Sequence, residues 1–462
     1  MAEPGAPRER RLLVAIFLAA LALCALVTKS HVVSWNDGSR IATVDALTAD
    51  HTFQIDGSRY NAGLGDKIRF RGRTYSDKPP LPAVQGAVVA TMLAPLGITL
   101  RRTPGTAIYL VTLFTVGVWF AVGCCYAYAF QRLIGFEQPV ALAVATLTGA
   151  GTLALPYASV LTNYVPCGAA GIAACYHLYR ARDGSRAELA LGGLAVSLCY
   201  AFDAAGAVFA LVAAVLLWGS PLRYWLLCAG AAVPVIAFQL AYNIVVSGSL
   251  LPTVFNLSVW SDPNLPLHAE SARVLVVHTP RENLAFLASI LVGDRGLFVY
   301  TPLMLVAAYG FWLMWRAGGR PRRLALAIVA SSVVYVLMIV FLQQTDAHAQ
   351  NFGERRYVDL YFALCTGLGP ALASARTALG MWAVRAVSVA SVAIAALGTI
   401  APFAGAPGEF GFTYAAAEFS ALYRRAPLQA VIDVLLLLVL LIFVLLVVDR
   451  ALITPRSARR NH

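Results

Sequence analysis

Stretches of about 20 apolar residues recur along the chain from Leu12 to Val448 and alternate with short polar segments. A helix of this length crosses the roughly 30 Å of hydrocarbon in a bilayer. Hydrophobic residues make up 59% of the 462-residue chain and charged residues only 13%, which excludes a water-soluble domain of this size. The pattern predicts an all-α polytopic membrane protein with about 12 transmembrane helices, within a range of roughly 11 to 13.

The basic residues lie mainly at the ends of the apolar stretches, at residues 8–11, 101–102, 316–323 and 456–460. Because Lys and Arg flank the cytoplasmic ends of membrane helices, this bias predicts a multi-pass protein of the inner (plasma) membrane with both termini in the cytoplasm. Together with anionic lipid head groups, these flanks explain the net charge of +12 without a nucleic acid partner.

The chain is predicted to form one transmembrane domain over residues 1–462, because no segment has the composition of a separate soluble domain. Residues 31–79 are predicted to form the first extracytoplasmic loop, and residues 247–295 a second large one. The basic residues 450–462 are predicted to be a cytoplasmic tail.

The first predicted loop carries the most regular polar pattern in the chain. Residues 39–49 place apolar side chains at helical spacing beside charged ones, which is typical of a short helix lying in the membrane interface. The segment around Gly72 predicts a hairpin, and a folded loop of this kind would form a lid or a wall of a site. The apolar run 80–100 is predicted as the next membrane span, so that Arg101 and Arg102 reach the cytoplasmic side.

Two ionisable residues lie at the edges of this loop: Asp37 just after the first apolar stretch, and Lys78 just before Pro79 and Pro80. Charged side chains beside hydrocarbon are costly and usually functional. Partial burial would raise the pKa of Asp37, which suits a general base, and Lys78 on an extended backbone would hold a phosphate. The alternatives are that Asp37 only caps the interfacial helix and that Lys78 only reaches lipid phosphates.

A second polar cluster, with Arg355 and Arg356, opens a later span on the same predicted outer face. Two arginines on this face oppose the positive-inside bias, which indicates that they bind an anion such as a phosphate. The alternative is that they pair with Glu354 and Asp359. Arg295, in a charged turn before another span, is a candidate of the same kind.

Four short segments together resemble the GT-C membrane glycosyltransferases, and most closely the protein O-mannosyltransferase and lipid A aminoarabinose transferase group. They are residues 36–40 (Asn-Asp-Gly-Ser-Arg), 72–80 (Gly-Arg-Thr-Tyr-Ser-Asp-Lys-Pro-Pro), 293–302 and 352–357 (Phe-Gly-Glu-Arg-Arg-Tyr). The resemblance implies a GT-C-like helical bundle. It also implies a hexosyl- or pentosyltransferase that moves a sugar from a polyprenyl-phosphate-linked donor lipid to an extracytoplasmic protein, lipid or glycan by direct displacement with inversion.

The resemblance also implies roles for single residues. Asp37 lies at the position of the first-loop acidic residue that acts as the base, although many members have an Asp-Glu pair where this chain has Asn36-Asp37. Lys78 matches the lysine that binds the carrier phosphate, and Arg355 and Arg356 resemble arginines that assist it. No cofactor is indicated, and dependence on a divalent metal is left open. Neighbouring residues predicted to contact substrate are Arg40, Tyr75, Asp77, Glu354 and Tyr357.

Two other functions use similar residues. A lipid or small-solute transporter, or a flippase, would hold a phosphate head group with the same cations, but the chain lacks the repeated halves common in transporters and a Walker A loop. A ligase or polymerase of surface polysaccharide would also need arginines on the outer face, but it would not need Asp37 paired with Lys78.

Overall fold

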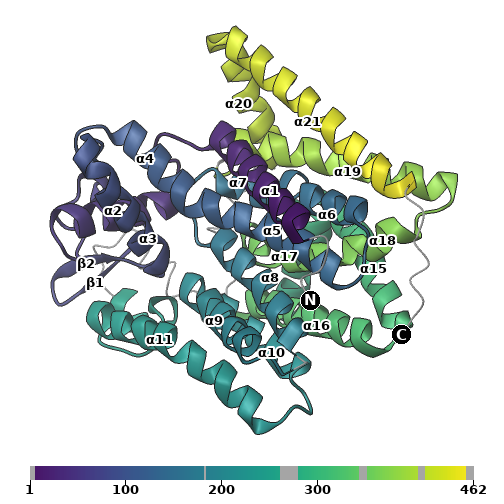
Figure 1. Cartoon of the computed structure of the whole chain (residues 1–462). Coiled ribbons are helices and arrows are strands. Elements are labelled where there is room, and N and C mark those ends of the chain that lie inside the picture. Colours follow the sequence, from purple (N-terminus) through teal and green to yellow (C-terminus); the bar gives the residue numbers. More distant parts are fainter. Residues whose placement is uncertain (1–5, 182–183, 261–278, 343–350, 404–410, 454–462) are drawn as a thin grey trace.

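The chain folds into a bundle of helices with a smaller lobe, which contains the two-stranded sheet, on one side (Figure 1). The structure is a computed structural model, and it describes residues 6–181, 184–260, 279–342, 351–403 and 411–453. Within these ranges, seven helical segments are long and apolar enough to cross a membrane: Pro7–Val27, Pro104–Leu133, Leu222–Ser247, Pro280–Tyr300, Gly319–Phe341, Ala378–Ile400 and Pro427–Ile453. The predicted all-α membrane fold is therefore confirmed, while the count of about 12 crossings stays a prediction.

The first half of the bundle follows the chain through helices of varied length. A π-helical turn, Leu113–Gly117, joins two of them into one long segment. The helices are α1 (Ala6–Val27), α4 (Pro104–Thr112), α5 (Val118–Leu133), α6 (Gln138–Ala150), α7 (Ala154–Ala158), α8 (Tyr164–Arg180), α9 (Arg186–Phe202), α10 (Ala210–Leu216) and α11 (Leu222–Ser247).

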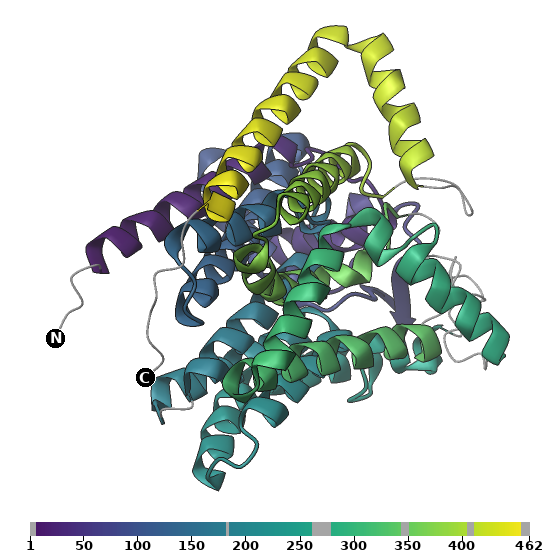
Figure 2. The same cartoon turned by 90° about the vertical axis from the view of Figure 1, so that its right-hand side faces the viewer.

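The second half adds helices around this framework. The turn between the last two, α20 and α21, projects beyond the rest of the bundle in both views, and α21 runs back from it so that its C-terminal end packs on the bundle (Figures 1 and 2). The helices are α13 (Pro280–Val292), α14 (Leu297–Tyr300), α15 (Leu303–Ala317), α16 (Gly319–Leu342), α17 (Val358–Leu364), α18 (Leu368–Ser374), α19 (Ala378–Ile400), α20 (Gly411–Arg425) and α21 (Pro427–Ile453).

The central helix is α8, which is buried along almost its whole length. Small residues allow its neighbours to approach closely: a Cβ atom at Gly168 would lie 2.6 Å from the carbonyl oxygen of Val358 on α17. At Gly171 a Cβ atom would lie 2.4 Å from the ring of Phe209. Close backbone contact at small residues is how membrane helices gain packing energy. The N-cap of α8 is Asn163, so the central helix presents a buried amide at this end.

The lobe consists of α2 (Trp35–Ala49), β1 (Lys67–Phe70), β2 (Arg73–Ser76) and α3 (Leu81–Leu93). Helix α2 begins with a capping box in which Ser34 is the N-cap. The expected hairpin around Gly72 is present: β1 and β2 pair antiparallel, and both Arg71 and Gly72 have positive φ angles, 49° and 74°, as tight hairpin turns require.

The predicted membrane span at 80–100 is wrong. Its residues form α3 and a short 3-10 turn that lie along α2, and Gly86 lets α3 approach Val44, where a Cβ atom would be 2.9 Å away. At the far end Arg101 pairs with Asp45 and Asp50 of the lobe at 3.1 and 2.9 Å. Hydropathy indicated an apolar helix correctly, but it does not distinguish a helix that crosses the bilayer from one that packs on a neighbouring lobe. Without a crossing at 80–100, the prediction that this segment carries Arg101 and Arg102 to the cytoplasmic side is also wrong.

Two other predicted segments are described only in part. The predicted loop 247–295 contains α13, which belongs to the Pro280–Tyr300 segment that is long and apolar enough to cross a membrane, so the loop's end at 295 stays a prediction. Its residues 261–278 lie outside the described part of the chain. In the predicted tail 450–462, α21 continues to Ile453, and residues 454–462 lie outside the described part.

Candidate active site

Lys78 lies between two carboxylates where the hairpin meets α3. Its Nζ is 2.7 Å from Asp66 Oδ2 and 2.7 Å from Asp77 Oδ2, and at most 15% of each side chain is exposed. The hairpin register explains this geometry: Lys67 pairs with Ser76, so the next residues outward, Asp66 and Asp77, end on the two sides of Lys78. The local fold thus holds one cation between two anions with little water.

Arg40, on α2, is 1% exposed and interacts electrostatically with Asp66 and Asp77. Its Nη1 donates to the backbone and side-chain oxygens of Asn36 at 2.7 and 2.6 Å, and its Nη2 donates to Asn163 Oδ1. Asn163 in turn donates its amide to Asp203, which ends α9. Among the described residues, Arg40 Nε has no hydrogen-bond partner. The guanidinium therefore keeps one buried donor unused.

Arg355 reaches the same region from the 3-10 helix Arg355–Tyr357, which precedes α17. Its Nη1 donates to Asn351 Oδ1 at 3.1 Å, and the guanidinium lies 5.8 Å from the ring centre of Tyr164. Its Nε is also buried without a hydrogen-bond partner in the described part of the chain. Asp66 interacts electrostatically with Lys78, Arg355 and Arg40, so three cations surround one carboxylate. We call these residues, together with Asp77, the charged centre.

Burial and pairing set the charges in this centre. Burial alone would lower the pKa of Lys78, but Asp66 and Asp77 outweigh it and raise the pKa, so the lysine is charged. Burial would raise the pKa of Asp66, but Lys78 and the two arginines hold it below its usual value. Burial and the charge of Asp66 raise the pKa of Asp77. Asp77 is thus the carboxylate on Lys78 that gains a proton more easily.

Asp37 lies at the start of α2 and is used by the helix cap. Its Oδ1 accepts hydrogen bonds from the backbone N–H and the hydroxyl of Ser34, both at 2.7 Å, and its Oδ2 accepts from the backbone N–H of Val33 at 2.9 Å. Burial raises the pKa of Asp37, and these hydrogen bonds oppose that rise. This is the geometry of the capping alternative, and the role of Asp37 as a base stays a prediction.

The other residues predicted in the second cluster surround Arg355. Glu354 is buried and caps the 3-10 helix by accepting from Arg356 N at 3.3 Å. The carbonyl of Arg295 accepts from Glu354 N at 3.2 Å, which joins the two charged turns. The charge of Arg356 acts on Asp203, and Tyr357 is buried.

Tyr75, predicted as a substrate contact, has a different place in the lobe. It lies on β2, is buried, and belongs to a small apolar cluster with Ile68, Tyr242, Val246 and Val259. Its position indicates packing of the hairpin against α11.

Sequence reasoning missed two members of this region, Asp66 and Asn163. Nothing in the sequence separates Asp66 from the other aspartates of the first loop, because its partner depends on the hairpin register. Asn163 stands among polar residues between two apolar runs, which is a weak signal for a buried amide. Asp203 is an ionisable residue inside an apolar stretch of the sequence. The hydrogen bond from Asn163 explains how its carboxylate is accommodated there.

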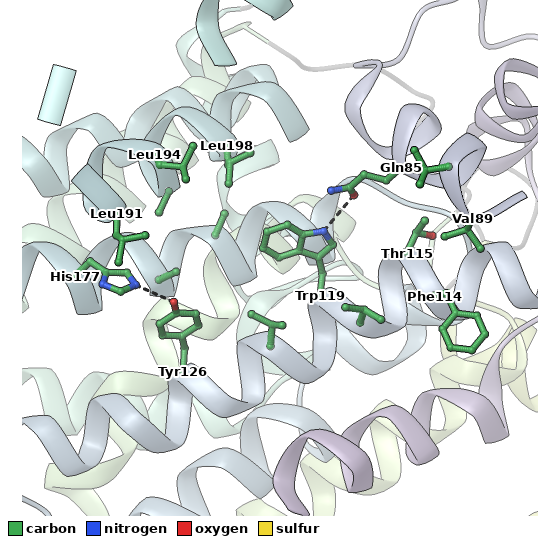
Figure 3. Close-up of a pocket in the computed structure, with 16 residues that line it drawn as sticks. Gln85, Val89, Phe114, Thr115, Trp119, Tyr126, His177, Leu191, Leu194 and Leu198 are labelled. Carbon is green, nitrogen blue, oxygen red and sulfur yellow. Dashed lines mark hydrogen bonds between the residues drawn. The ribbon is translucent and has the colours of Figure 1, made fainter. Parts of the chain in front are cut away.

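Two apolar grooves run between helices of the bundle. The larger, about 610 Å³, runs between α15, α16 and α17 and reaches Leu297 and Tyr357, close to Arg295 and Arg355. The second, about 530 Å³, follows α5 between α3 and α9, and two hydrogen-bonded pairs lie along it (Figure 3). They are Gln85 with Trp119 and Tyr126 with His177.

The chain is similar to solved structures of membrane glycosyltransferases. With ArnT from Cupriavidus metallidurans bound to undecaprenyl phosphate, the TM-score is 0.53 at 15% identity, over 95% of this chain and 77% of ArnT. The apo state of the same protein gives 0.51 at 16% identity, over 97% and 78%. The archaeal oligosaccharyltransferase AglB from Archaeoglobus fulgidus, in complex with an inhibitory peptide and a dolichol-phosphate, gives 0.50 at 11% identity, over 98% and 62%.

No protein-family model matches the sequence, and no curated protein matches it either. ArnT, the lipid A aminoarabinose transferase, and AglB are both GT-C glycosyltransferases. The expected GT-C fold is therefore confirmed, and at these identities the likeness is one of fold.

Proposed function

We propose that this chain, with its GT-C fold, is a membrane glycosyltransferase that moves a sugar from a polyprenyl-phosphate-linked donor to an extracytoplasmic acceptor by direct displacement with inversion. The observation that carries the proposal is the charged centre. Arg40 is buried and Lys78 and Arg355 are partly buried around Asp66, and the two arginines keep buried Nε donors without partners among the described residues. Buried donors of this kind are costly unless a ligand accepts from them.

The charged centre suits the leaving group of this reaction. As the acceptor oxygen bonds to the anomeric carbon, the bond from that carbon to the phosphate oxygen breaks, and negative charge develops on the phosphate. Cations already fixed in a poorly hydrated site stabilise that charge without reorganising. Removing one such donor typically costs about 10²–10³ in turnover.

Asp37 remains our candidate for the base that takes the proton of the acceptor hydroxyl. It is 2% exposed, and its two oxygens hold three hydrogen bonds from Val33 and Ser34. These bonds fix the carboxylate at the N-terminus of α2, three residues before Arg40. A base in this place requires that an acceptor hydroxyl reach the cap of α2.

The donor's isoprenoid chain would lie in the larger apolar groove, because Tyr357, which follows Arg355 and Arg356 in the chain, lines that groove. Ala308 lines the groove and is exposed, so Ala308→Trp would fill it with little effect on the core. Leu194→Trp in the second groove is the matched control. We expect the first substitution to weaken binding of undecaprenyl phosphate and the second to leave it unchanged.

The placement of α3 supports an extracytoplasmic charged centre. With residues 80–100 on the lobe, we take α1, the α4–α5 segment and the shorter helices α6 and α8 as four crossings before Arg180. A cytoplasmic N-terminus then puts the lobe outside and the basic turn at Arg180 inside, in agreement with the positive-inside rule. Cysteine substitutions at Arg59 and Arg186, probed with a membrane-impermeant thiol reagent on intact cells of a variant lacking native cysteines, test this orientation. Labelling of residue 186 but not residue 59 would overturn it.

The function itself is tested by offering the purified full chain a radiolabelled undecaprenyl-phosphate sugar together with crude envelope lipids and proteins. Label should move to an acceptor, and Lys78→Ala and Arg355→Ala should stop the transfer in folded protein. Arg101→Ala, which removes a cation from an exposed pair of the same lobe, should retain it. Movement of the carrier across sealed vesicles without a new glycosidic bond would instead support a transporter.

A further inference from the structure

The charged centre in this structure already holds counter-ions on its lysine. An ammonium group has three N–H donors, and Asp66 and Asp77 each take one at 2.7 Å. A phosphate that contacts Lys78 through more than one oxygen must therefore compete with at least one carboxylate. One of the two carboxylates must therefore move away from Lys78 when the phosphate binds.

The two carboxylates are held unequally. Both carboxylates interact electrostatically with Lys78 and Arg40, and both backbone oxygens accept a hydroxyl hydrogen bond, from Ser39 at 2.6 Å for Asp66 and from Thr253 at 2.8 Å for Asp77. Asp66 also interacts electrostatically with Arg355. Asp77 uses only Oδ2 for Lys78. Its Oδ1 is buried and has no hydrogen-bond partner among the residues that the structure describes. Asp77 is thus the more weakly held of the two and the easier one to displace.

An ionised Asp77 that has been displaced from Lys78 would be energetically unfavourable. The groups around it are Lys78 on its own segment, Asp66 before β1, Arg40 on α2, and Tyr242 on α11. With Lys78 bound to phosphate, its near neighbours would include two anions, Asp66 and the phosphate. Like charges in a poorly hydrated site favour protonation of one of them. The neutral acid could then donate a hydrogen bond to the phosphate.

We infer that Asp77 is a proton-binding residue of the donor site: the carrier phosphate displaces it from Lys78, and Asp77 takes up one proton from solution as the phosphate binds. This inference rests on the proposed function, because the ligand is the phosphate of the polyprenyl carrier. One phosphate and one proton enter together, and no covalent bond changes. Affinity for the carrier phosphate therefore falls as the pH rises.

The test measures the affinity of undecaprenyl phosphate for the full chain in nanodiscs between pH 6 and pH 8.5, by isothermal titration calorimetry. One coupled proton gives at most about a tenfold loss of affinity per pH unit. Asp77→Asn should bind more tightly than the wild type at pH 8 and should show a weaker pH dependence. The phosphate of the ligand titrates in part of this range, and this variant removes only the contribution of Asp77.

Asp50→Asn is the matched control, because Asp50 pairs with the exposed Arg101 of the same lobe. It should keep both the affinity and the pH dependence of the wild type. Inorganic phosphate should show the same direction of pH dependence with lower affinity, since it lacks an apolar chain. If inorganic phosphate binds as tightly as the lipid, the carrier is not the ligand and the inference fails.

The wild type alone provides a second readout in case Asp77→Asn does not fold. Titrations at pH 8 in buffers of different ionisation enthalpy count the protons taken up with each lipid bound. Binding with no proton uptake, or weaker binding by Asp77→Asn, would overturn the inference and make Asp77 a positioning residue for Lys78. No binding of undecaprenyl phosphate at any pH would overturn the proposed function itself.

Discussion

Two clusters in the lobe have the same composition and opposite surroundings. In each, one cation lies between two aspartates: Lys78 between Asp66 and Asp77, and Arg101 between Asp45 and Asp50. Lys78 is 15% exposed and both of its partners are less so, whereas Arg101 and Asp50 are 47% and 36% exposed and Asp45, at 1%, is the buried member of its cluster. The charges and the hydrogen-bond distances are similar, so burial is what separates the two clusters.

This difference in burial suggests different roles, a structural one for the exposed cluster and a ligand-binding one for the buried cluster. Solvent screens the exposed cluster, which fixes the end of the α3 segment against α2 at a modest gain. The buried cluster carries a desolvation cost that apolar side chains of the same size would avoid. It also lies next to two arginines with unused donors, which the exposed cluster does not. A costly arrangement in such a place is expected where a charged ligand binds.

The largest expected difference follows removal of each cation. Lys78→Met leaves two carboxylates buried without their main partner and should lower the free energy of unfolding by about 3–5 kcal/mol. Arg101→Met should lower it by less, because water reaches Arg101 and Asp50, although the change leaves Asp45, which is 1% exposed, without this partner. Unfolding in mixed micelles of detergent and SDS measures both. Equal losses would show that burial does not separate the clusters.

A smaller effect should follow removal of all three charges of the buried cluster. Lys78→Met combined with Asp66→Asn and Asp77→Asn should recover at least about 2 kcal/mol of the loss, since no unpaired charge stays buried. The same variant should still fail to bind undecaprenyl phosphate. Recovery of binding together with stability would contradict the role of Lys78.

The pH dependence of stability gives a third comparison. The pKa of Asp77 is raised by burial, so the folded state holds its proton more tightly than the unfolded state. Stability should therefore rise as the pH falls from neutral towards about 4, by at most about 1.4 kcal/mol per pH unit. Asp66 acts in the opposite direction, because its lowered pKa makes its contribution disappear only as the pH falls below about 4.

Thermal unfolding of Asp77→Asn checks this account. The variant should have a flatter profile between pH 4 and pH 7 than the wild type. A profile of unchanged slope would mean that other groups produce the pH dependence.

The smallest expected effect is that of Asp50→Asn in the exposed cluster. It should change the free energy of unfolding by about 1 kcal/mol or less, because Asp45 still pairs with Arg101 at 3.1 Å and water solvates the freed donor. Unfolding in SDS and the calorimetric affinity for undecaprenyl phosphate should both match the wild type. A large loss of affinity would show that the exposed cluster also contributes to binding of the lipid.

The sequence supported the GT-C fold and several members of the charged centre. Arg40, Asp77, Lys78 and Arg355 were all predicted as substrate contacts, and the structure brings them together around Asp66. Lys78 was accessible to prediction because a lysine before two prolines at the start of an apolar run is an unusual local pattern. Asp66 was not, because only the pairing of Lys67 with Ser76 identifies its partner.

Two further points depended on long-range packing. Hydropathy predicted a crossing at 80–100, but Arg101 with Asp45 and Asp50 holds the end of this segment on the lobe. From the sequence, Asp37 could act either as a helix cap or as a base. In the structure it forms the capping box of α2 with Ser34. Neither point follows from residue spacing, since each depends on which element lies opposite.

The hydrogen bonds from Arg40 through Asn163 to Asp203 join the lobe to the middle of the bundle. Lifting the lobe would take Arg40 away and leave Asn163 and Asp203 in the bundle without this cation, which makes a hinged movement of the lobe energetically unfavourable. Under the proposed function, a polyprenyl donor would then reach the charged centre from the side, within the plane of the bilayer, while the lobe stays in place.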